Sequence, residues 1–298
     1  MPSVHASPAS EHATATSSGR ITAPPLVDAR WLHANRDSVT VIDVRPASEH
    51  AGAHVPGSIS LPLDALLRDD TSRPVIEQLA ASTRDELARL GIDPDAHVAL
   101  VDDGCGAASL AASILELAGL RRVSAVHGSA IDLWRTIGAD IDEGVHDAAE
   151  SSAAAWASVP SRHGIVAAFE DLVDAVVDDA AHVVDARSQL EHEGIVGAPC
   201  CATRGAIPES VHLEWTAFFD IADAPRSSDR VREIAAHVGL DPDTAIIVTC
   251  HAGHRAAIAA RVLRGAGFRN VRVSLGSWHE WAARGLGSGV ADDSPLHA

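Results

Sequence analysis

An internal repeat constrains this chain more than any other feature of its sequence. Residues 90–129 align without a gap with residues 238–277, 148 positions later, and 14 of the 40 aligned pairs are identical. Eight of the other 26 pairs exchange one aliphatic residue for another, and the two copies together indicate a duplicated structural unit. Residues that both copies share are expected to maintain the fold, whereas residues that differ at the end of a strand are candidates for chemistry.

The length of the chain agrees with a duplication. Its 298 residues suit two domains, because a domain of about 100–150 residues buries an adequate core without disulfides or metals. We predict an N-terminal domain at residues 21–140, a linker at 141–163 and a C-terminal domain at 164–298. Residues 1–20 are small and polar, which predicts a disordered tail and is unlike a secretory signal.

Each half alternates short apolar runs with helical stretches. This pattern is typical of a parallel sheet covered by helices on both faces, so the predicted fold class is α/β with two similar domains in tandem. The predicted strands are residues 39–43, 98–101, 123–126, 183–187, 246–249 and 271–273, and the predicted helices are residues 83–90, 108–117, 231–238 and 256–264.

Charge and composition exclude several classes of function. The net charge of −18 argues against nucleic acid and against anionic membranes as partners, and no apolar run reaches the ~18 residues needed to cross a bilayer. The chain has no lysine, so Schiff-base chemistry is excluded and an anionic substrate must be held by arginine. Without an export signal, the 4 cysteines are expected to be thiols in a reducing cytoplasm.

The two copies of the repeat differ where the second predicted strand ends. Cys250 follows the strand in the second copy, and Asp102 stands at the aligned position in the first copy. Five residues later, Arg255 aligns with Ala107. The carboxyl end of a parallel strand is where open α/β sheets bind ligands, so Cys250 and Arg255 are the leading functional candidates.

The segment after Cys250 has the features of an anion-binding loop. It is short and contains Gly253, so its backbone N–H groups can converge on the sulfur, and a helix N-terminus follows near Arg255. The guanidinium of Arg255 and a protonated His251 or His254 would also stabilise a thiolate. The pattern predicts a thiolate nucleophile; the alternative is a buried structural cysteine.

These motifs resemble the tandem rhodanese family of two-domain sulfurtransferases. In that family the C-terminal domain carries a six-residue active-site loop that begins with cysteine, and the N-terminal domain has lost it. The resemblance lies in residues 41–45 with 54–59, residues 184–187 with 205–211, residues 250–255 and residues 276–281. It implies two rhodanese-like domains, of which only the second is active.

The resemblance implies a ping-pong reaction that needs no cofactor. Cys250 would take the outer sulfur of a small anionic donor as a persulfide and pass it to cyanide or a thiol. Residues that would bind the substrate are Arg187, His251, Ala252, Gly253, His254 and Arg255. For Arg187 a salt bridge within the domain is the alternative role, because Arg45 occupies the same place in the first half.

The family pattern also bears on the donor. Thiosulfate-preferring members have basic residues after the cysteine and mercaptopyruvate-preferring members have small polar ones, whereas this chain has His251 and Ala252. The second arginine that mercaptopyruvate enzymes carry soon after the Asp-Ala-Arg motif is missing here, since none follows Arg187 until Arg204. Thiosulfate is therefore the favoured donor and 3-mercaptopyruvate the alternative.

Two other functions remain open at this stage. A sulfur-relay module that hands its persulfide to a protein partner would suit the ending His254-Arg255 and the adjacent Cys200 and Cys201. A Cys-Arg phosphatase would need the spacing C-x5-R, and the loop here is one residue shorter.

The other cysteines and the histidines give weaker signals. Residues 194–204 have no counterpart in the first half and are expected to form a surface loop, in which Cys200 and Cys201 are either a sulfur-accepting pair or incidental. Cys105 aligns with Gly253 and has no arginine partner, so it is not expected to be catalytic. The spacing of the histidines predicts no metal site.

Overall fold

The described part of the chain forms two five-stranded sheets whose strand orders correspond one to one. A computed structural model describes residues 23–144 and 152–289. The orders are β1-β5-β4-β2-β3 and β6-β10-β9-β7-β8, with every neighbouring pair parallel. The strands are β1 (Leu26–Val27), β2 (Thr40–Asp43), β3 (Ile59–Ser60), β4 (His97–Val101), β5 (Arg122–Val126), β6 (Val166–Ala167), β7 (His182–Asp185), β8 (Val211–His212), β9 (Ala245–Thr249) and β10 (Asn270–Ser274). The predicted fold class is confirmed.

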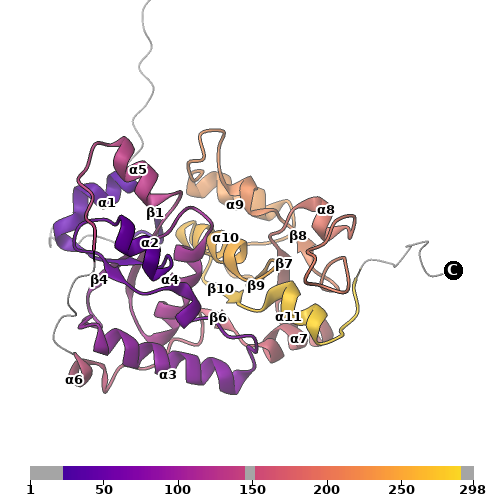
Figure 1. The fold of residues 1–298 in the computed structure, drawn as a ribbon. Helices are drawn as coiled ribbons and strands as arrows, with labels where there is room; N and C mark the ends of the chain where they lie inside the picture. Colours follow the sequence, from indigo (N-terminus) through magenta and orange to yellow (C-terminus); the bar gives the residue numbers. More distant parts are fainter. Residues whose placement is uncertain (1–22, 145–151, 290–298) are drawn as a thin grey trace, which may run out of the picture.

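Helices surround both sheets (Figure 1). In the first half they are α1 (Ala29–Asn35), α2 (Ala47–Gly52), α3 (Arg73–Arg89), α4 (Ala107–Ala118) and α5 (Ala130–Thr136), with 3-10 turns η1 (Arg36–Ser38) and η2 (Leu63–Ala65). In the second half they are α7 (Phe169–Asp178), α8 (Gln189–His192), α9 (Ser228–Ala236), α10 (His254–Gly265) and α11 (Ser277–Ala283), with η3 (Trp215–Phe218), and α6 (Ala153–Trp156) lies between the halves. No helix in residues 23–144 and 152–289 is long and apolar enough to cross a membrane.

The central strands explain why the sequence folds in this way. All five residues of β4 are buried, and so are the last four of β9. Strands that are covered on both faces read as continuous aliphatic runs, which is what the repeat contains at these positions. In β9, Val248 pairs with Val184 of β7 and with Val273 of β10, so the strand that leads to Cys250 is held from both sides.

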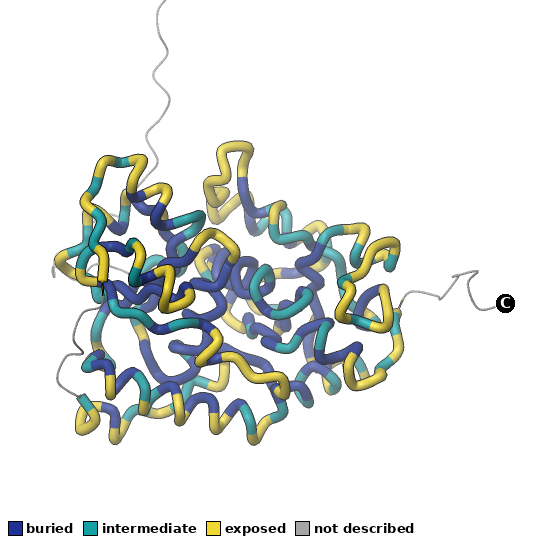
Figure 2. Tube along the Cα trace, viewed as in Figure 1, coloured by how far each residue is buried: buried dark blue, intermediate teal, exposed yellow. Residues whose placement is uncertain are grey.

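Helices α4 and α10 form the centre of the contact between the domains, and Figure 2 shows this region of the chain as buried. A Cβ atom on Gly106 would lie 2.9 Å from Ile258, and one on Gly253 would lie 2.9 Å from Leu110. Ile258 and Leu110 are aligned residues of the repeat, so the contact is nearly symmetric. Each glycine has a positive φ, 87° and 83°, which a larger residue adopts only with strain.

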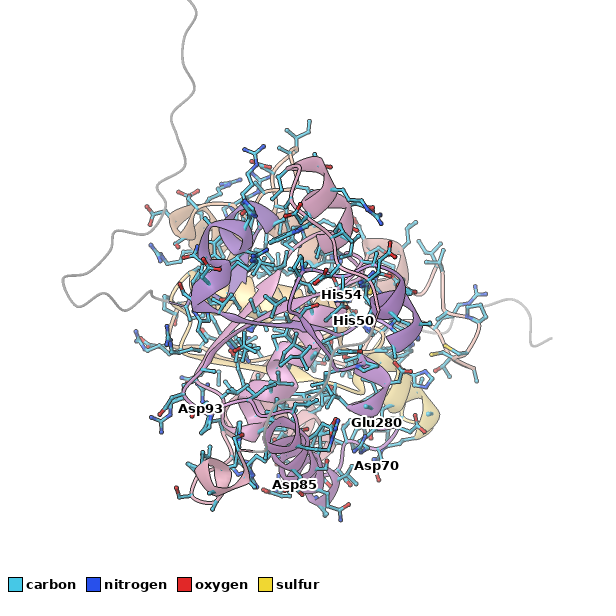
Figure 3. All side chains as sticks on the ribbon, turned by 60° about the vertical axis from the view of Figure 1, so that its left-hand side comes forward. His50, His54, Asp70, Asp85, Asp93 and Glu280 are labelled. Carbon is cyan, nitrogen blue, oxygen red and sulfur yellow. The ribbon has the colours of Figure 1, made fainter. Side chains whose placement is uncertain are left out.

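Charged pairs also join the domains. Glu116 of α4 accepts hydrogen bonds from Arg261 and Arg264 of α10. On another face, the buried Glu280 of α11 accepts a hydrogen bond from the backbone N–H of Thr71 at 3.0 Å. Figure 3 shows Glu280 close to Asp70, the residue before Thr71 in the first half. The N-terminal domain therefore supports the helix that follows the last strand of the second sheet.

The predicted linker is only partly a connecting segment. Of residues 141–163, the structure describes all but 145–151, and helix α6 packs against α3. The side chain of Trp156 is buried, and its indole N–H donates to the carbonyl of Ile92 at 2.8 Å. The buried Trp156 thus fixes this part of the segment to the N-terminal domain. The predicted tail at residues 1–20 lies outside the described residues.

Candidate active site

Cys250 follows β9 directly and is fixed in place by the start of α11. Its backbone N–H donates to the hydroxyl of Ser277 at 3.1 Å, and that hydroxyl donates to the carbonyl of Ser274 at 2.7 Å. The Cys250 carbonyl accepts a hydrogen bond from the N–H of Trp278 at 3.0 Å. The Cys250 side chain is only 1% exposed, so a substrate reaches the sulfur only when neighbouring side chains move.

The loop after Cys250, residues 250–255, presents backbone N–H groups without acceptors. Helix α10 begins at His254, and its first N–H that bonds within the helix turn is that of Ala257, which donates to Gly253 at 2.8 Å. Among the described residues, none accepts a hydrogen bond from the N–H groups of residues 251–256. Free N–H groups at a helix N-terminus are a binding site for an anion.

The aligned loop of the first half, residues 102–107, contains such an anion already. The carboxylate of Asp102 accepts hydrogen bonds from the N–H of Gly104 at 2.8 Å and from the N–H of Ala108 at 3.0 Å. Asp102 is 1% exposed, so its charge is held by these donors rather than by water. In the second half the aligned groups belong to residues 252 and 256, and Cys250 stands in place of the carboxylate.

Arg255 forms a two-pronged salt bridge beside this loop. Its guanidinium donates to the two carboxylate oxygens of Glu191 at 2.7 and 2.8 Å. The Arg255 hydrogen bond lowers the pKa of Glu191 to about 2, and the same contact raises the pKa of Arg255. A thiolate at Cys250 raises the pKa of Arg255 further, which places the two groups within electrostatic reach. Glu191 was not predicted from the sequence as the partner of Arg255, although Ser188-x-x-Glu191 is a capping-box pattern that places it at the start of α8.

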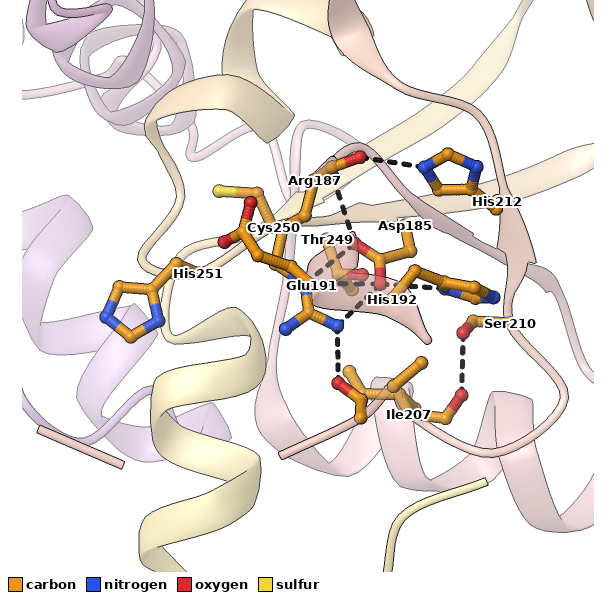
Figure 4. A network of polar contacts seen from close by, with 12 residues as sticks. Asp185, Arg187, Glu191, His192, Ile207, Ser210, His212, Thr249, Cys250 and His251 are labelled. Atoms are coloured by element: carbon orange, nitrogen blue, oxygen red, sulfur yellow. Dashed lines mark hydrogen bonds and ion pairs between the residues drawn. The ribbon is translucent and has the colours of Figure 1, made fainter. Parts of the chain in front are cut away.

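Arg187 makes the internal salt bridge that was weighed as its alternative role. Its guanidinium donates to Asp185 at 2.9 and 2.6 Å and to the carbonyl of Gly205 at 2.7 Å, and Arg187 is 3% exposed. Figure 4 shows this network in one view with Cys250. Arg45 makes the same contacts with Asp43 and Ala53 in the first half, so this pair maintains the fold in both domains. A role for Arg187 in substrate binding stays a prediction.

The surroundings of His251 do not favour a positive charge on its ring. Burial lowers the pKa of His251, and the nearby His279 and Arg255 lower it further. His251 is therefore neutral at pH 7, which corrects the expectation that it adds charge. A ring nitrogen of His254 lies 3.0 Å from the carbonyl of Ala252, a contact inside the loop.

Cys105 differs from Cys250 in its electrostatic surroundings. Partial burial raises the pKa of the Cys105 thiol, and the carboxylates of Asp102 and Asp103 raise it further. Its side chain hydrogen bonds to Asp102 at 3.7 Å. These surroundings keep Cys105 in the thiol form at neutral pH, which makes it a poor nucleophile.

An insertion in the second half reaches the loop from outside. The buried Arg45 and the carbonyl that it contacts, that of Ala53, are 8 residues apart, whereas the aligned Arg187 and Gly205 are 18 residues apart. The second half therefore has ten additional residues here. The added residues lie in the segment 194–204, which is a loop, as expected. The sulfur of Cys200 lies 3.3 Å from a ring nitrogen of His251. This proximity has no signal in the sequence, because the two residues are 51 positions apart.

The buried carboxylate of Asp185 leads to an expected dependence of stability on pH. Burial raises its pKa, but hydrogen bonds from His192 and Arg187 outweigh burial and bring it to about 2. Because the pKa of Asp185 is lower in the folded state than in the unfolded state, ionised Asp185 contributes roughly 2 kcal/mol to the free energy of unfolding. This contribution is complete above about pH 4 and is lost as the pH falls toward 2. Urea unfolding at pH 6 and pH 2 measures this loss, and Asp185→Asn should remove that much of the pH dependence. The exposed Asp174 of α7 gives the matched control, since Asp174→Asn should leave the dependence unchanged.

Comparisons with known proteins agree with this architecture. The rhodanese-like domain profile matches residues 28–134 and 168–284. The chain is 28% identical over 278 residues to a 3-mercaptopyruvate sulfurtransferase of Escherichia coli, covering 87% of this chain and 95% of the relative. It is 28% identical to a putative thiosulfate sulfurtransferase of Haloferax volcanii, covering 86% and 92%.

A solved structure gives the same result for the fold. The crystal structure of a 3-mercaptopyruvate sulfurtransferase from Escherichia coli superposes with a TM-score of 0.65 and 22% identity, covering 85% of this chain and 98% of the other. The profile matches both halves of the chain, over the Cys250 loop and every strand except the edge strands β1 and β6. The chain is a member of the rhodanese family, with two rhodanese-like domains in tandem.

Proposed function

We propose that this protein is a sulfurtransferase in which Cys250 carries the transferred sulfur. The observation that supports this most is the contrast between the two aligned loops. In the first half the carboxylate of Asp102 accepts hydrogen bonds from the loop, whereas in the second half Cys250 stands at that position and the N–H groups of residues 251–256 have no acceptor among the described residues. A loop of this kind suits a sulfur that is negatively charged both before and after transfer.

The reaction would proceed in two displacements. In the first, the Cys250 thiolate attacks the outer sulfur of thiosulfate, the sulfur–sulfur bond breaks, and sulfite leaves with the electron pair. The Cys250 persulfide carries a negative charge, which the loop N–H groups and Arg255 stabilise. In the second, cyanide or a thiolate attacks the outer sulfur of the persulfide, and the sulfur–sulfur bond to Cys250 breaks. The acceptor leaves as thiocyanate or as a persulfide, and the Cys250 thiolate is restored. No external oxidant or reductant is needed, and a reducing cytoplasm would keep the four free cysteines as thiols.

Thiosulfate is our proposed donor, with 3-mercaptopyruvate as the alternative. The guanidinium of Arg187 is buried in its contacts with Asp185 and Gly205, and His251 is neutral, so Arg255, which is partly exposed although it pairs with Glu191, is the accessible cation of the loop. Converging N–H groups with one cation suit a compact dianion such as thiosulfate. The relative from Escherichia coli that is named for 3-mercaptopyruvate keeps the second donor open.

Steady-state rates with the two donors test the proposal. With cyanide as acceptor, thiocyanate formation should have the higher kcat/KM with thiosulfate. A higher kcat/KM with 3-mercaptopyruvate would reverse the choice of donor but keep the sulfurtransferase. Absence of turnover and of persulfide with both donors would contradict the function itself.

A further inference from the structure

Four side chains with metal-binding atoms meet on the outer side of the Cys250 loop. They are Cys200, Cys201, His251 and His279, and one ligand atom from each lies within 4.8 Å of all the others. They come from three separate segments: the insertion at residues 194–204, the Cys250 loop and helix α11. The spacing of these residues in the sequence predicts no metal site, because the four side chains meet only in the folded chain.

A tight turn explains how two adjacent cysteines can face the same site. The N–H of Cys201 donates to the carbonyl of Ala198 at 3.0 Å, which closes a four-residue turn with Pro199 at its second position. Proline is favoured there because its ring fixes φ near the value that the turn requires. In an extended segment the two side chains would point to opposite sides, whereas here Cys200 lies 3.3 Å from His251 and Cys201 lies 3.9 Å from His279.

The backbone also holds the two histidines together. The N–H of His279 donates to the carbonyl of His251 at 2.9 Å, so α11 and the Cys250 loop are fixed relative to each other. The imidazole rings lie 5.5 Å apart at an angle of 73°. Both thiols are free, and Cys200 is exposed, so the insertion can supply the remaining movement.

The two cysteine sulfurs and two histidine nitrogens of this cluster indicate which metal it would bind. Two thiolates and two imidazoles form the tetrahedral ligand set of zinc, with ligand atoms about 3.3–3.8 Å apart for bonds of about 2.0–2.3 Å. The cluster spans up to 4.8 Å, so the side chains must close by about 1 Å, which rotations of the partly exposed side chains supply. The four ligand residues include no carboxylate, which disfavours calcium and magnesium.

We propose that Cys200, Cys201, His251 and His279 bind one Zn²⁺ ion. On binding, the two thiols release their protons to solvent and two S–Zn and two N–Zn bonds form, so the centre is neutral and no redox step takes place. The site belongs to the second half alone. The first half lacks the insertion, and the positions that align with His251 and His279 are Asp103 and Ile131.

The site lies where an ion would regulate the neighbouring cysteine. His251 follows Cys250 directly, and a bound ion would tie the insertion and α11 to the loop. Because the Cys250 side chain is only 1% exposed, its reaction requires neighbouring groups to move, and the ion opposes that movement. Zinc should therefore inhibit sulfur transfer reversibly, a consequence that rests on the proposed function, whereas the binding of zinc does not.

Equilibrium dialysis of the reduced, metal-free full chain against Zn²⁺ tests the site, with bound metal measured by mass spectrometry. We expect one ion per chain, and binding weaker by about 100-fold or more in Cys200→Ser/Cys201→Ser and in His279→Asn. Cys105→Ser and Cys250→Ser are matched controls that should keep the full stoichiometry. Cobalt substitution should give the intense visible absorption of a tetrahedral thiolate complex in the wild type and in the two controls but not in the ligand variants, and circular dichroism checks that each variant is folded.

Two results would overturn the proposal. One is the absence of zinc binding by the wild type, and the other is equal binding by the wild type and Cys200→Ser/Cys201→Ser. A loss of zinc in Cys250→Ser would mean that the ion binds the candidate nucleophile instead. In the activity assay, zinc should slow sulfur transfer by the wild type but not by Cys200→Ser/Cys201→Ser, and a chelator should restore the rate. Equal inhibition of the wild type and of Cys200→Ser/Cys201→Ser would contradict the regulatory role. If the chain transfers no sulfur, the proposed function fails, and the dialysis experiment still tests zinc binding by itself.

Discussion

Replacing Cys250 with serine is expected to abolish sulfur transfer, with kcat lower by roughly 10⁴-fold or more, as when a catalytic nucleophile is removed. The serine hydroxyl cannot form a persulfide, and it is not ionised at neutral pH. The substitution nearly preserves the volume of a side chain that is 1% exposed, so the fold should be retained. Thiocyanate formation from thiosulfate and cyanide measures the loss.

The duplication provides controls for this prediction. Cys105→Ser, in the aligned loop of the first half, should leave turnover unchanged. Asp102→Cys in the Cys250→Ser background should not restore activity, because Ala107 stands where the second half has Arg255. Normal turnover by Cys250→Ser would show that the sulfur is carried elsewhere, whereas a rate restored by Asp102→Cys would show that the loop does not need an arginine.

Replacing Arg255 with alanine is expected to lower kcat/KM for thiosulfate by about 10²–10³-fold, the usual effect of removing one donor to a developing anion. Two physical reasons support this size. The loop loses the cation that lies within electrostatic reach of Cys250, and the carboxylate of Glu191 loses the partner that holds its pKa at about 2. An unpaired carboxylate beside the loop would repel an anionic donor. The rate of persulfide formation in a single turnover measures the effect on the first step.

Variants of Glu191 distinguish the loss of the Arg255 cation from the repulsion by an unpaired carboxylate. Glu191→Gln removes the negative charge and should lower kcat/KM less than Arg255→Ala does, and Arg255→Ala/Glu191→Gln should recover part of the activity. A purely structural salt bridge would give a different result, because activity would then follow the free energy of unfolding in all three variants. Arg255→Ala with an unchanged kcat/KM would remove this residue from the site.

The sequence was sufficient for the central part of each domain. The long aliphatic runs at β4 and β9 and the helices after them are strong signals, because they are buried on both faces and occur twice. The edge strands β1, β3, β6 and β8 have only two residues each, which is too short for any period to be visible. Helix α3 begins at Arg73, ten residues before the predicted start. Its buried residues Ile76, Leu79, Ala80 and Thr83 follow the spacing of one helix face, so the missed turns did carry a helical signal in the sequence.

In the candidate site, contacts between residues close in sequence could be predicted, whereas contacts between residues far apart in sequence could not. Cys250 and Arg255 are five residues apart, so the sequence alone could pair them through one short loop. The partner of Arg255 is Glu191, 64 residues away, and the cysteines near His251 are on an insertion that the first half lacks. Contacts of this kind depend on the sheet order, which brings the ends of β7 and β9 together. That Cys250 carries the sulfur stays a prediction.

The most direct test of that claim is the mass of the protein after reaction with thiosulfate. The reduced chain, freed of excess donor, should gain the mass of one sulfur atom, peptide mapping should place it on Cys250, and cyanide should remove it as thiocyanate. A chain that stays unmodified, or that carries the added sulfur on Cys105, Cys200 or Cys201 but not on Cys250, would contradict the account.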